Sequence, residues 1–193
     1  MARIAYVRRE VEIPQGVKVH VSGKRVRVEG PLGAVEKDFS HAKDVQITYE
    51  DGKVVLEAFN ADKKTYATIG TLASMVRNMM IGVEKGFKYK MKIVYAHFPM
   101  TVKVDEKNGL VVIENFLGQR GKIAASILPG VKVRVDRDDV IVEGVDKEAV
   151  AQTVANIHQV TRLRGKQRMC PHGREGGPGV LDGIYLYAVE HMR

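Results

Sequence analysis

The side chains in this sequence that are best spaced for chemistry are cations, and their chemistry is the binding of phosphate. Between Phe87 and Ile93 every second residue is a lysine, namely Lys88, Lys90 and Lys92. If this segment is a β-strand, alternate residues project from one face, and the three lysines form a straight row of positive charge. Such a row can contact the phosphates of a nucleic acid. A solvated strand face, or a sheet edge that lysines protect from aggregation, explains the same pattern.

A second group of cations follows a predicted helix. Arg162, Arg164, Lys166 and Arg168 alternate with uncharged residues, and Arg174 lies a little further along the chain. Cations near the C-terminus of a helix interact favourably with the helix dipole, which explains Arg162 and Arg164 without a ligand. Lys166 and Arg168 lie beyond the helix, so the helix dipole does not explain them. The loop rich in Gly and Pro that follows either orders against a polyanion or is a flexible tail.

The placement of charge along the chain favours the second half as the binding half. The sequence has 31 Lys and Arg against 23 Asp and Glu, for a formal net charge of +8. Such an excess favours an anionic partner, such as nucleic acid or a membrane surface. Three stretches contain no acidic residue, at 85–104, 115–135 and 149–174. The middle stretch adds Arg120 and Lys122 to the candidate cations.

No group of residues predicts catalysis or a metal centre. The single cysteine, Cys170, has no His–Asp pair at an evident spacing, so nucleophilic catalysis is not indicated. Cys170 and His172 are two possible zinc ligands, whereas a structural zinc site has four. The sequence also lacks a P-loop and a dinucleotide-binding fingerprint. We therefore expect a protein that is not an enzyme and that has no metal, no cofactor and no small-molecule substrate.

The composition is typical of a globular protein that does not cross a membrane. Hydrophobic residues make up 45% of the chain and charged residues 28%. No apolar run approaches the roughly 20 residues that span a bilayer, and the first residues are too highly charged for a signal peptide. One cysteine cannot form an internal disulfide. We expect a cytoplasmic protein with no membrane partner.

The elements that must position the cations occur twice along the chain. A shift of 85 residues aligns 17–33 with 102–118, a shift of 86 aligns 45–57 with 131–143, and a shift of 82 aligns 70–75 with 152–157. A competing alignment pairs 16–19 with 130–133, but it ends after one hairpin. We prefer the first alignment because it keeps a hairpin, a strand, a hairpin and a helix in the same order.

Each half predicts the same elements. Alternating valines predict hairpins at 17–28, 46–58, 102–113 and 131–142. An Asp-Gly turn at 51–52 and an Asn-Gly turn at 108–109 support two of them. Apolar residues at helical spacing follow each pair of hairpins. Asp62 is the expected N-cap of the first helix, and the second helix begins near Asp146.

We therefore predict an α+β fold of two tandem duplicated domains with a C-terminal tail. Each domain is an antiparallel β-sheet covered by one α-helix. The first repeat spans 1–82, the second repeat spans 83–165, and a basic tail rich in Gly and Pro spans 166–193. The second repeat is the expected main domain for binding an anionic partner, because the acid-free stretches lie in it and in the tail.

Several segments together resemble one family. They are KGFKYKM at 85–91, VYAHFP at 94–99, IENFLG at 113–118 and LDGIY at 181–185. On these residues the chain resembles large ribosomal subunit protein six, called protein nine in eukaryotes, in its archaeal and eukaryotic form. The resemblance covers nearly the whole chain, including the duplication. One departure is the insertion rich in Gly and Pro before Asp182, where relatives usually carry a shorter basic segment.

The resemblance implies a structural protein of the large ribosomal subunit. Members of the family bind large-subunit ribosomal RNA, chiefly through the second domain and the tail. They lie near the base of the factor-binding stalk and the sarcin–ricin loop, among neighbouring large-subunit ribosomal proteins. Carried over by position, 95–99 and 115–120 lie near the RNA-facing end. There His97 could donate a hydrogen bond and Phe98 could stack on a base, although core packing is the favoured role for Phe98.

We therefore expect a ribosomal protein that neutralises RNA phosphates with Lys and Arg and reads RNA shape with its loops and tail. The expected RNA-binding residues are Lys88, Lys90, Lys92, His97, Arg120, Lys122, Arg162, Arg164, Lys166, Arg168 and Arg174. The alternative is a non-ribosomal protein-interaction module of two β-sheet domains, in which the charge serves solubility.

Overall fold

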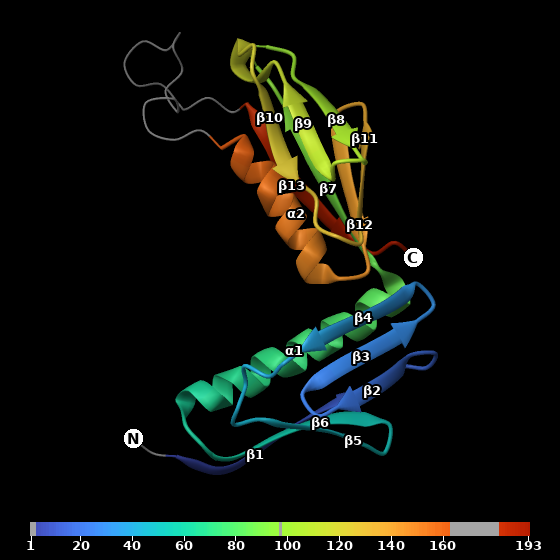
Figure 1. The fold of residues 1–193 in the computed structure, drawn as a ribbon, viewed down its shortest axis with the longest axis vertical. Coiled ribbons are helices and arrows are strands. Elements are labelled where there is room, and N and C mark those ends of the chain that lie inside the picture. The colour runs from blue at the N-terminus through green and yellow to red at the C-terminus, as the bar shows by residue number, and fades with distance from the viewer. Residues whose placement is uncertain (1–2, 97, 163–181) are drawn as a thin grey trace. The chain divides into compact units, whose positions relative to one another are not determined.

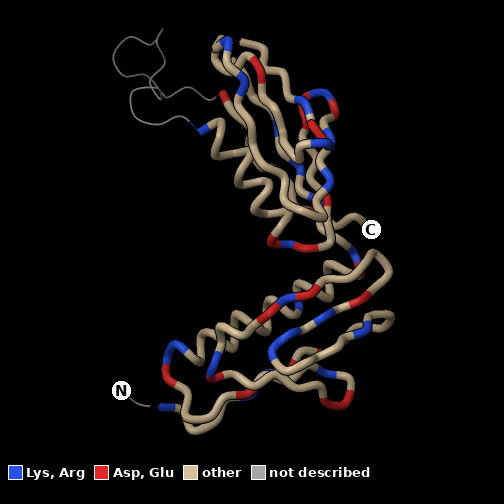
Figure 2. Tube along the Cα trace, in the orientation of Figure 1, with Lys and Arg blue, Asp and Glu red and all other residues tan. Residues whose placement is uncertain are grey.

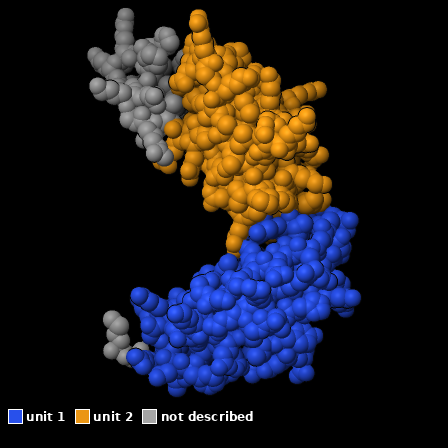
Figure 3. Space-filling view, in the orientation of Figure 1, with its two compact units in different colours: residues 1–86, 145–147, 193 blue, residues 87–144, 148–192 orange. Residues whose placement is uncertain are grey.

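The computed structural model of the chain describes residues 3–96, 98–162 and 182–193. The chain forms two compact units (Figures 1 and 3). Unit 1 comprises residues 1–86, 145–147 and 193, and unit 2 comprises residues 87–144 and 148–192. The division falls after Gly86 rather than after residue 82, because the first helix continues to Lys85.

Unit 1 is built from two antiparallel sheets and a long helix (Figure 1). Its elements are β1 (Ile4–Glu12), β2 (Lys18–Ser22), β3 (Arg25–Gly30), β4 (Gly33–Asp38), β5 (Gln46–Glu50), β6 (Lys53–Ala61) and α1 (Lys63–Lys85). One sheet has the strand order β1-β6-β5 and the other has the order β2-β3-β4. Strands of both sheets contact α1, so the apolar side of the helix closes a core between the sheets.

The sequence determines where α1 begins, where it ends and which side it buries. Asp62 accepts a hydrogen bond from the backbone N of Thr65 at 2.7 Å, as an N-cap does. The helix ends at Gly86, whose φ of 69° favours glycine. The apolar residues expected on one face are all buried, namely Ile69, Leu72, Val76, Met79, Met80 and Val83. The predicted helix and its cap are confirmed.

Unit 2 repeats the same elements and adds one strand. Its elements are β7 (Phe87–Val94), β8 (Thr101–Asp105), β9 (Leu110–Glu114), the short helical turn η1 (Phe116–Gly118), β10 (Lys122–Ser126), β11 (Val131–Asp136), β12 (Asp139–Gly144), α2 (Lys147–Val160) and β13 (Gly183–Glu190). One sheet has the order β10-β9-β8 and the other has the order β11-β12-β7-β13.

The two units match strand for strand, which confirms the predicted duplicated α+β fold. The order β1-β6-β5 recurs as β7-β12-β11, and β2-β3-β4 recurs as β8-β9-β10. The preferred sequence alignment is therefore the structural one, because the competing alignment would pair β2 and β3 with β11 and β12. The structure adds a second sheet to each domain beyond the single sheet that the valine pattern indicated.

The added strand β13 changes the account of the C-terminal segment. β13 pairs antiparallel with β7, placing Gly183 opposite Val94 and Glu190 opposite Lys88. Residues 183–190 are thus part of a sheet of unit 2, whereas the sequence placed all of 166–193 in a tail. The sequence did not predict this strand. Its partner β7 lies far away in the chain, so no hairpin turn indicates the pairing.

Each unit buries its own apolar residues. The core of unit 1 includes Val26, Val28, Leu56, Ile69 and Leu72, and the buried residues of unit 2 include Met91, Ile113, Val142, Ile157 and Ile184. Burial of one such side chain stabilises a fold by about 1.5–3 kcal/mol. Within the described residues, neither α1 nor α2 combines the length and apolar character needed to cross a membrane.

Candidate nucleic-acid interface

One end of unit 2 brings together loops that are far apart in the sequence, and we call this end the tip. The tip comprises residues 95–96, 98–100, 115–122, 161–162 and 182. Asn115 Nδ2 donates a hydrogen bond to the backbone O of Pro99 at 2.8 Å, and the backbone N of Ala96 donates to Asp182 Oδ1 at 2.8 Å. Two side chains therefore fix three loops to one another.

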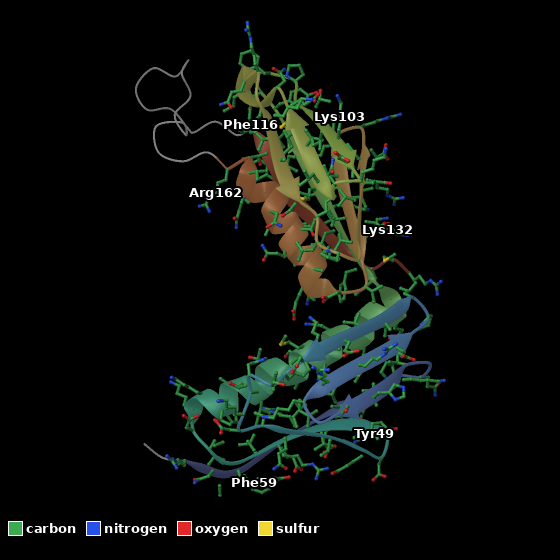
Figure 4. The ribbon with its side chains drawn as sticks, viewed as in Figure 1. Tyr49, Phe59, Lys103, Phe116, Lys132 and Arg162 are labelled. Carbon is green, nitrogen blue, oxygen red and sulfur yellow. The ribbon has the colours of Figure 1, made fainter. Side chains whose placement is uncertain are left out.

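The end of α2 is joined to the same place. The backbone N of Ile184 donates to Thr161 Oγ1 at 3.1 Å, and His158 Nδ1 lies 2.9 Å from the backbone O of Ile184. These bonds hold the start of β13 beside the last turn of the helix. Arg162 is exposed just beyond that turn (Figure 4). Arg162 and Asp182 therefore both lie at the tip.

The loop at 115–118 has an unusual backbone. Asn115 and Leu117 have positive φ angles of 59° and 54°, although neither is glycine, and Gly118 has a φ of 72°. Positive φ at residues other than glycine carries strain, which is concentrated at ligand-binding sites in proteins. The ring of Phe98 packs on Gly118, where an added Cβ would lie 3.2 Å from the ring.

The expectation that Phe98 packs in the core is wrong. Its side chain is 45% exposed, because the ring lies on a surface glycine rather than inside the sheets. The neighbouring apolar residues Met100 and Phe116 are buried instead. A base can therefore approach the free face of the Phe98 ring, which aromatic side chains that bind single-stranded RNA require.

An ion-paired cluster lies beside this loop. Glu114 Oε2 is 2.8 Å from Lys103 Nζ, and Glu114 Oε1 is 2.9 Å from Lys122 Nζ. Hydrogen bonds from Lys103 and then from Lys122 lower the pKa of Glu114 to about 2. Both lysine side chains are more than half exposed. The cluster thus carries a net positive charge that an RNA phosphate can reach.

Lys103 was not among the expected RNA-binding residues, although it lies in an acid-free stretch. The Asn-Gly turn at 108–109 sets the register of its hairpin, in which Lys103 is opposite Val112. That register places Lys103 diagonally across from Glu114, and Lys122 is directly opposite Glu114 on β10. The hairpin register was the signal that could have identified Lys103.

The predicted lysine row lies elsewhere, on the face of the four-stranded sheet away from Tyr89 and Met91. We call this face the outer face of unit 2. β7 lies between β12 and β13, so protection of a sheet edge does not explain the row. Each lysine is within ion-pair distance of a carboxylate on a neighbouring strand, at 3.5 Å for Lys88–Glu143, 2.9 Å for Lys90–Glu190 and 3.3 Å for Lys92–Asp139.

These carboxylates reduce the charge of the row. The hydrogen bond from Lys90 to Glu190 raises the pKa of Lys90 and lowers the pKa of Glu190. Lys and Arg are interspersed with Asp and Glu over unit 2 (Figure 2). On β11, Arg134 also contacts Glu143, at 3.2 Å, whereas Lys132 is exposed and forms no ion pair with any described residue.

The structure separates the expected RNA-binding residues into two groups. Arg120, Lys122 and Arg162 lie at the tip, whereas Lys88, Lys90 and Lys92 lie along the outer face of unit 2. His97, Arg164, Lys166, Arg168 and Arg174 lie outside the described residues. The RNA-binding roles of all these residues stay predictions.

The described residues of the tip can bind an anion but do not form a metal centre. In the described part of the chain, no group of three or more His, Cys, Asp or Glu side chains is placed to hold a metal ion. Cys170 and His172 lie outside that part. The tip presents exposed cations and the exposed Phe98 ring on loops that hydrogen bonds join to one another.

Comparison with known proteins points to one family. The family model described as ribosomal protein L6 matches residues 13–86 and 98–168, one match in each half of the chain. Proteins named large ribosomal subunit protein uL6 are similar along nearly their full length. The protein from Aeropyrum pernix is 48% identical over 190 residues, with 98% of each chain covered. The protein from Pyrobaculum aerophilum is 45% identical over 197 residues, with 99% of each chain covered.

Proposed function

Since this chain belongs to the ribosomal protein L6 family and is a structural component of the ribosome, we propose that it binds large-subunit ribosomal RNA through the tip of unit 2. The exposed cations of the tip contact RNA phosphates, and the ring of Phe98 stacks on an unpaired base. The protein reads the shape of the folded RNA rather than its sequence, because most of these contacts are to the backbone.

The observation that carries this proposal is the convergence of cations at the tip and in the Glu114 cluster beside it. Lys103 and Lys122 share one carboxylate, and Arg120 and Arg162 form no ion pair with described residues. Hydrogen bonds from Asn115 and to Asp182 hold the loops that carry them. A site held by rigid strands loses little conformational entropy on binding, so its electrostatic attraction is retained as affinity.

The lysine row on the outer face of unit 2 has a smaller role in this proposal. Lys88, Lys90 and Lys92 are already within reach of carboxylates, which an RNA phosphate would have to displace. We place the bound RNA near the base of the factor-binding stalk and the sarcin–ricin loop. This location rests on the resemblance of 94–99 and 113–118 to the family.

The experiment measures binding of the full chain to a transcript that contains the sarcin–ricin region, at several salt concentrations. In the tip variant, Arg120, Lys122 and Arg162 are all changed to Ala. Each lost phosphate contact reduces the slope of log affinity against log salt by about 0.7–0.9. We expect the tip variant to lower the slope by about 2 and to weaken binding about tenfold.

Two matched variants keep this test specific. Changing Lys88, Lys90 and Lys92 to Ala removes the same charge from the outer face of unit 2, and changing Lys18, Lys24 and Arg25 to Ala removes it from unit 1. We expect both to retain most of the salt dependence. Equal losses from all three variants would show that net charge, and not the tip, binds the RNA.

A further inference from the structure

The duplication leaves one sheet edge of unit 1 without the strand that covers its counterpart in unit 2. β7 is the counterpart of β1, and β13 covers its free side along seven aligned residue pairs, from Gly183–Val94 to Glu190–Lys88. β1 is an edge strand of nine residues, and among the described residues it pairs only with β6. Its open edge presents backbone N–H and C=O groups that another strand can bind.

We propose that the β1 edge binds an extended, cationic segment of another protein as an added antiparallel strand. The position and direction of this strand follow from β13, which fills the equivalent place in unit 2. The main-chain hydrogen bonds supply a general affinity, and the side chains on alternate positions supply the choice of partner. The inference does not rest on the RNA-binding proposal, because it concerns a different unit and a different class of partner.

The charges beside β1 indicate why the segment is cationic. On the face of the β1-β6-β5 sheet that carries Arg8, which we call the outer face of unit 1, four carboxylates share two cations. Arg8 lies 3.1 Å from Glu10, 3.1 Å from Glu50 and 3.5 Å from Glu57. Lys53 lies 3.2 Å from Glu10 and 3.5 Å from Glu12. Incoming Lys or Arg side chains would balance the two carboxylates in excess.

The covering strand of unit 2 shows the same complementarity with the opposite sign. The outer face of unit 2 carries the lysine row, and β13 brings Glu190 to within 2.9 Å of Lys90. The outer face of unit 1 has the reverse excess, so an RNA backbone would be repelled there. A cationic protein segment therefore complements the outer face of unit 1 better than an RNA backbone does.

An exposed aromatic pair extends the site at one end of β1. Tyr6 is directly opposite Phe59 on β6, with ring centroids 5.2 Å apart. Tyr6 is 45% exposed and Phe59, which Figure 4 labels, is 62% exposed. The Tyr6 hydroxyl donates a hydrogen bond to Glu57. A guanidinium group can lie over such a ring with a carboxylate nearby, and the aliphatic part of its side chain covers apolar surface.

The test uses the full chain and a short labelled peptide of alternating valine and arginine. Fluorescence anisotropy measures affinity, and hydrogen exchange measures protection of the amides of residues 4–12. We expect the peptide of valine and arginine to bind and to protect these amides. We expect a peptide of alternating valine and glutamate neither to bind nor to protect them. In the test variant Glu10 and Glu12 become Gln, which we expect to weaken binding about fivefold.

The matched control changes Glu29 and Glu36 to Gln. These residues also pair with an exposed arginine, Arg27, but they lie on the other sheet of unit 1. We expect this control to bind the peptide within about twofold of the unchanged chain, and Phe59→Leu to bind more weakly. Binding without protection of residues 4–12, or equal losses in both double variants, would overturn the proposal. So would protection by RNA, or protection that rises with protein concentration alone, which would identify a second copy as the occupant.

Discussion

Glu114 shows how one carboxylate can organise two cations at an exposed site. Its two oxygens contact Lys103 and Lys122, which hold both ammonium groups on one side of the β8-β9-β10 sheet. Because both lysines remain largely exposed, the carboxylate positions them without hiding their charge. The low pKa of Glu114, about 2, records this arrangement.

The low pKa of Glu114 predicts a specific dependence of stability on pH. A carboxyl group whose pKa is lower in the folded state stabilises the fold above its unfolded pKa, and loses this effect as pH falls toward the folded pKa. The contribution of Glu114 is therefore present above about pH 4.5 and disappears between that value and about pH 2. We expect Glu114→Gln to lose less of its urea midpoint between pH 7 and pH 3 than the unchanged chain does.

Glu106 supplies the control for this prediction, because it is exposed and has no ion pair among the described residues. Glu106→Gln should lose as much of its urea midpoint between these pH values as the unchanged chain. If Glu114→Gln behaved in the same way, the two lysine contacts would contribute nothing to folding.

Gly118 predicts a second effect at a single residue. Any other residue at this position would have to adopt a positive φ, and its Cβ would lie 3.2 Å from the Phe98 ring. We expect Gly118→Ala to lower the free energy of unfolding by about 1–2 kcal/mol and to weaken RNA binding, measured by urea titration and by anisotropy. Gly121→Ala is the matched change in the same loop, where a Cβ meets no heavy atom within 4 Å and φ is not positive. A similar loss in both variants would rule out the close packing as the cause.

At the scale of elements, α1 depends on its first turn. Asp62 caps the helix, and the hydrogen bond from the Thr65 backbone lowers the pKa of Asp62. We expect Asp62→Ala to lower the free energy of unfolding by about 1 kcal/mol, whereas Asp62→Asn retains an acceptor and most of the stability. Urea unfolding and hydrogen exchange in α1 would measure both. An equal loss in the two variants would mean that charge, rather than the cap, stabilises the helix.

The sequence predicted strands well where residues typical of a tight turn join them. It predicted strands poorly where no such turn joins them to a neighbour. The Asp51-Gly52 turn adopts the positive φ values, 44° and 77°, that its residues favour, and β5 and β6 flank it as expected. β1 was not predicted, because charged residues interrupt its alternation and its partner β6 lies more than forty residues away. β4 and β10 were expected only as a strand between the two hairpins of each half. Each buries a single residue, so the pattern was too weak to predict their bounds.

The site was predicted in part, for a similar reason. Charge counting along the chain found the stretches that supply the cations of the tip, because local sequence determines which residues lie in a loop. It could not find the carboxylates that pair with the lysine row. Glu190 reaches Lys90 across a hundred residues of sequence, and only the pairing of β13 with β7 brings them together.

At the scale of the whole molecule, the two units have separate cores, which predicts separable effects of core substitutions. Leu72 is 1% exposed in unit 1, and its replacement by Ala should cost about 2–5 kcal/mol. We expect Leu72→Ala to lower hydrogen-exchange protection in unit 1, while RNA binding by unit 2 stays within about twofold. Ile157 is fully buried in α2. We expect Ile157→Ala to lower hydrogen-exchange protection in unit 2 and to weaken RNA binding, while protection in unit 1 is retained. Loss of protection in both units from either change would show one cooperative structure.

The position of β13 in the chain also sets the order in which the protein can be completed during its synthesis. Translation proceeds from the N-terminus, and domains fold as their residues emerge. The strands of both sheets of unit 1 and α1 lie within the first 86 residues, whereas the edge of β7 stays open until β13 has been made. The bond between Ala96 and Asp182 that fixes the tip must wait as well. A nascent chain therefore completes the strands and helix of unit 1 first, and a polypeptide released before Asp182 lacks a completed tip with which to compete for RNA.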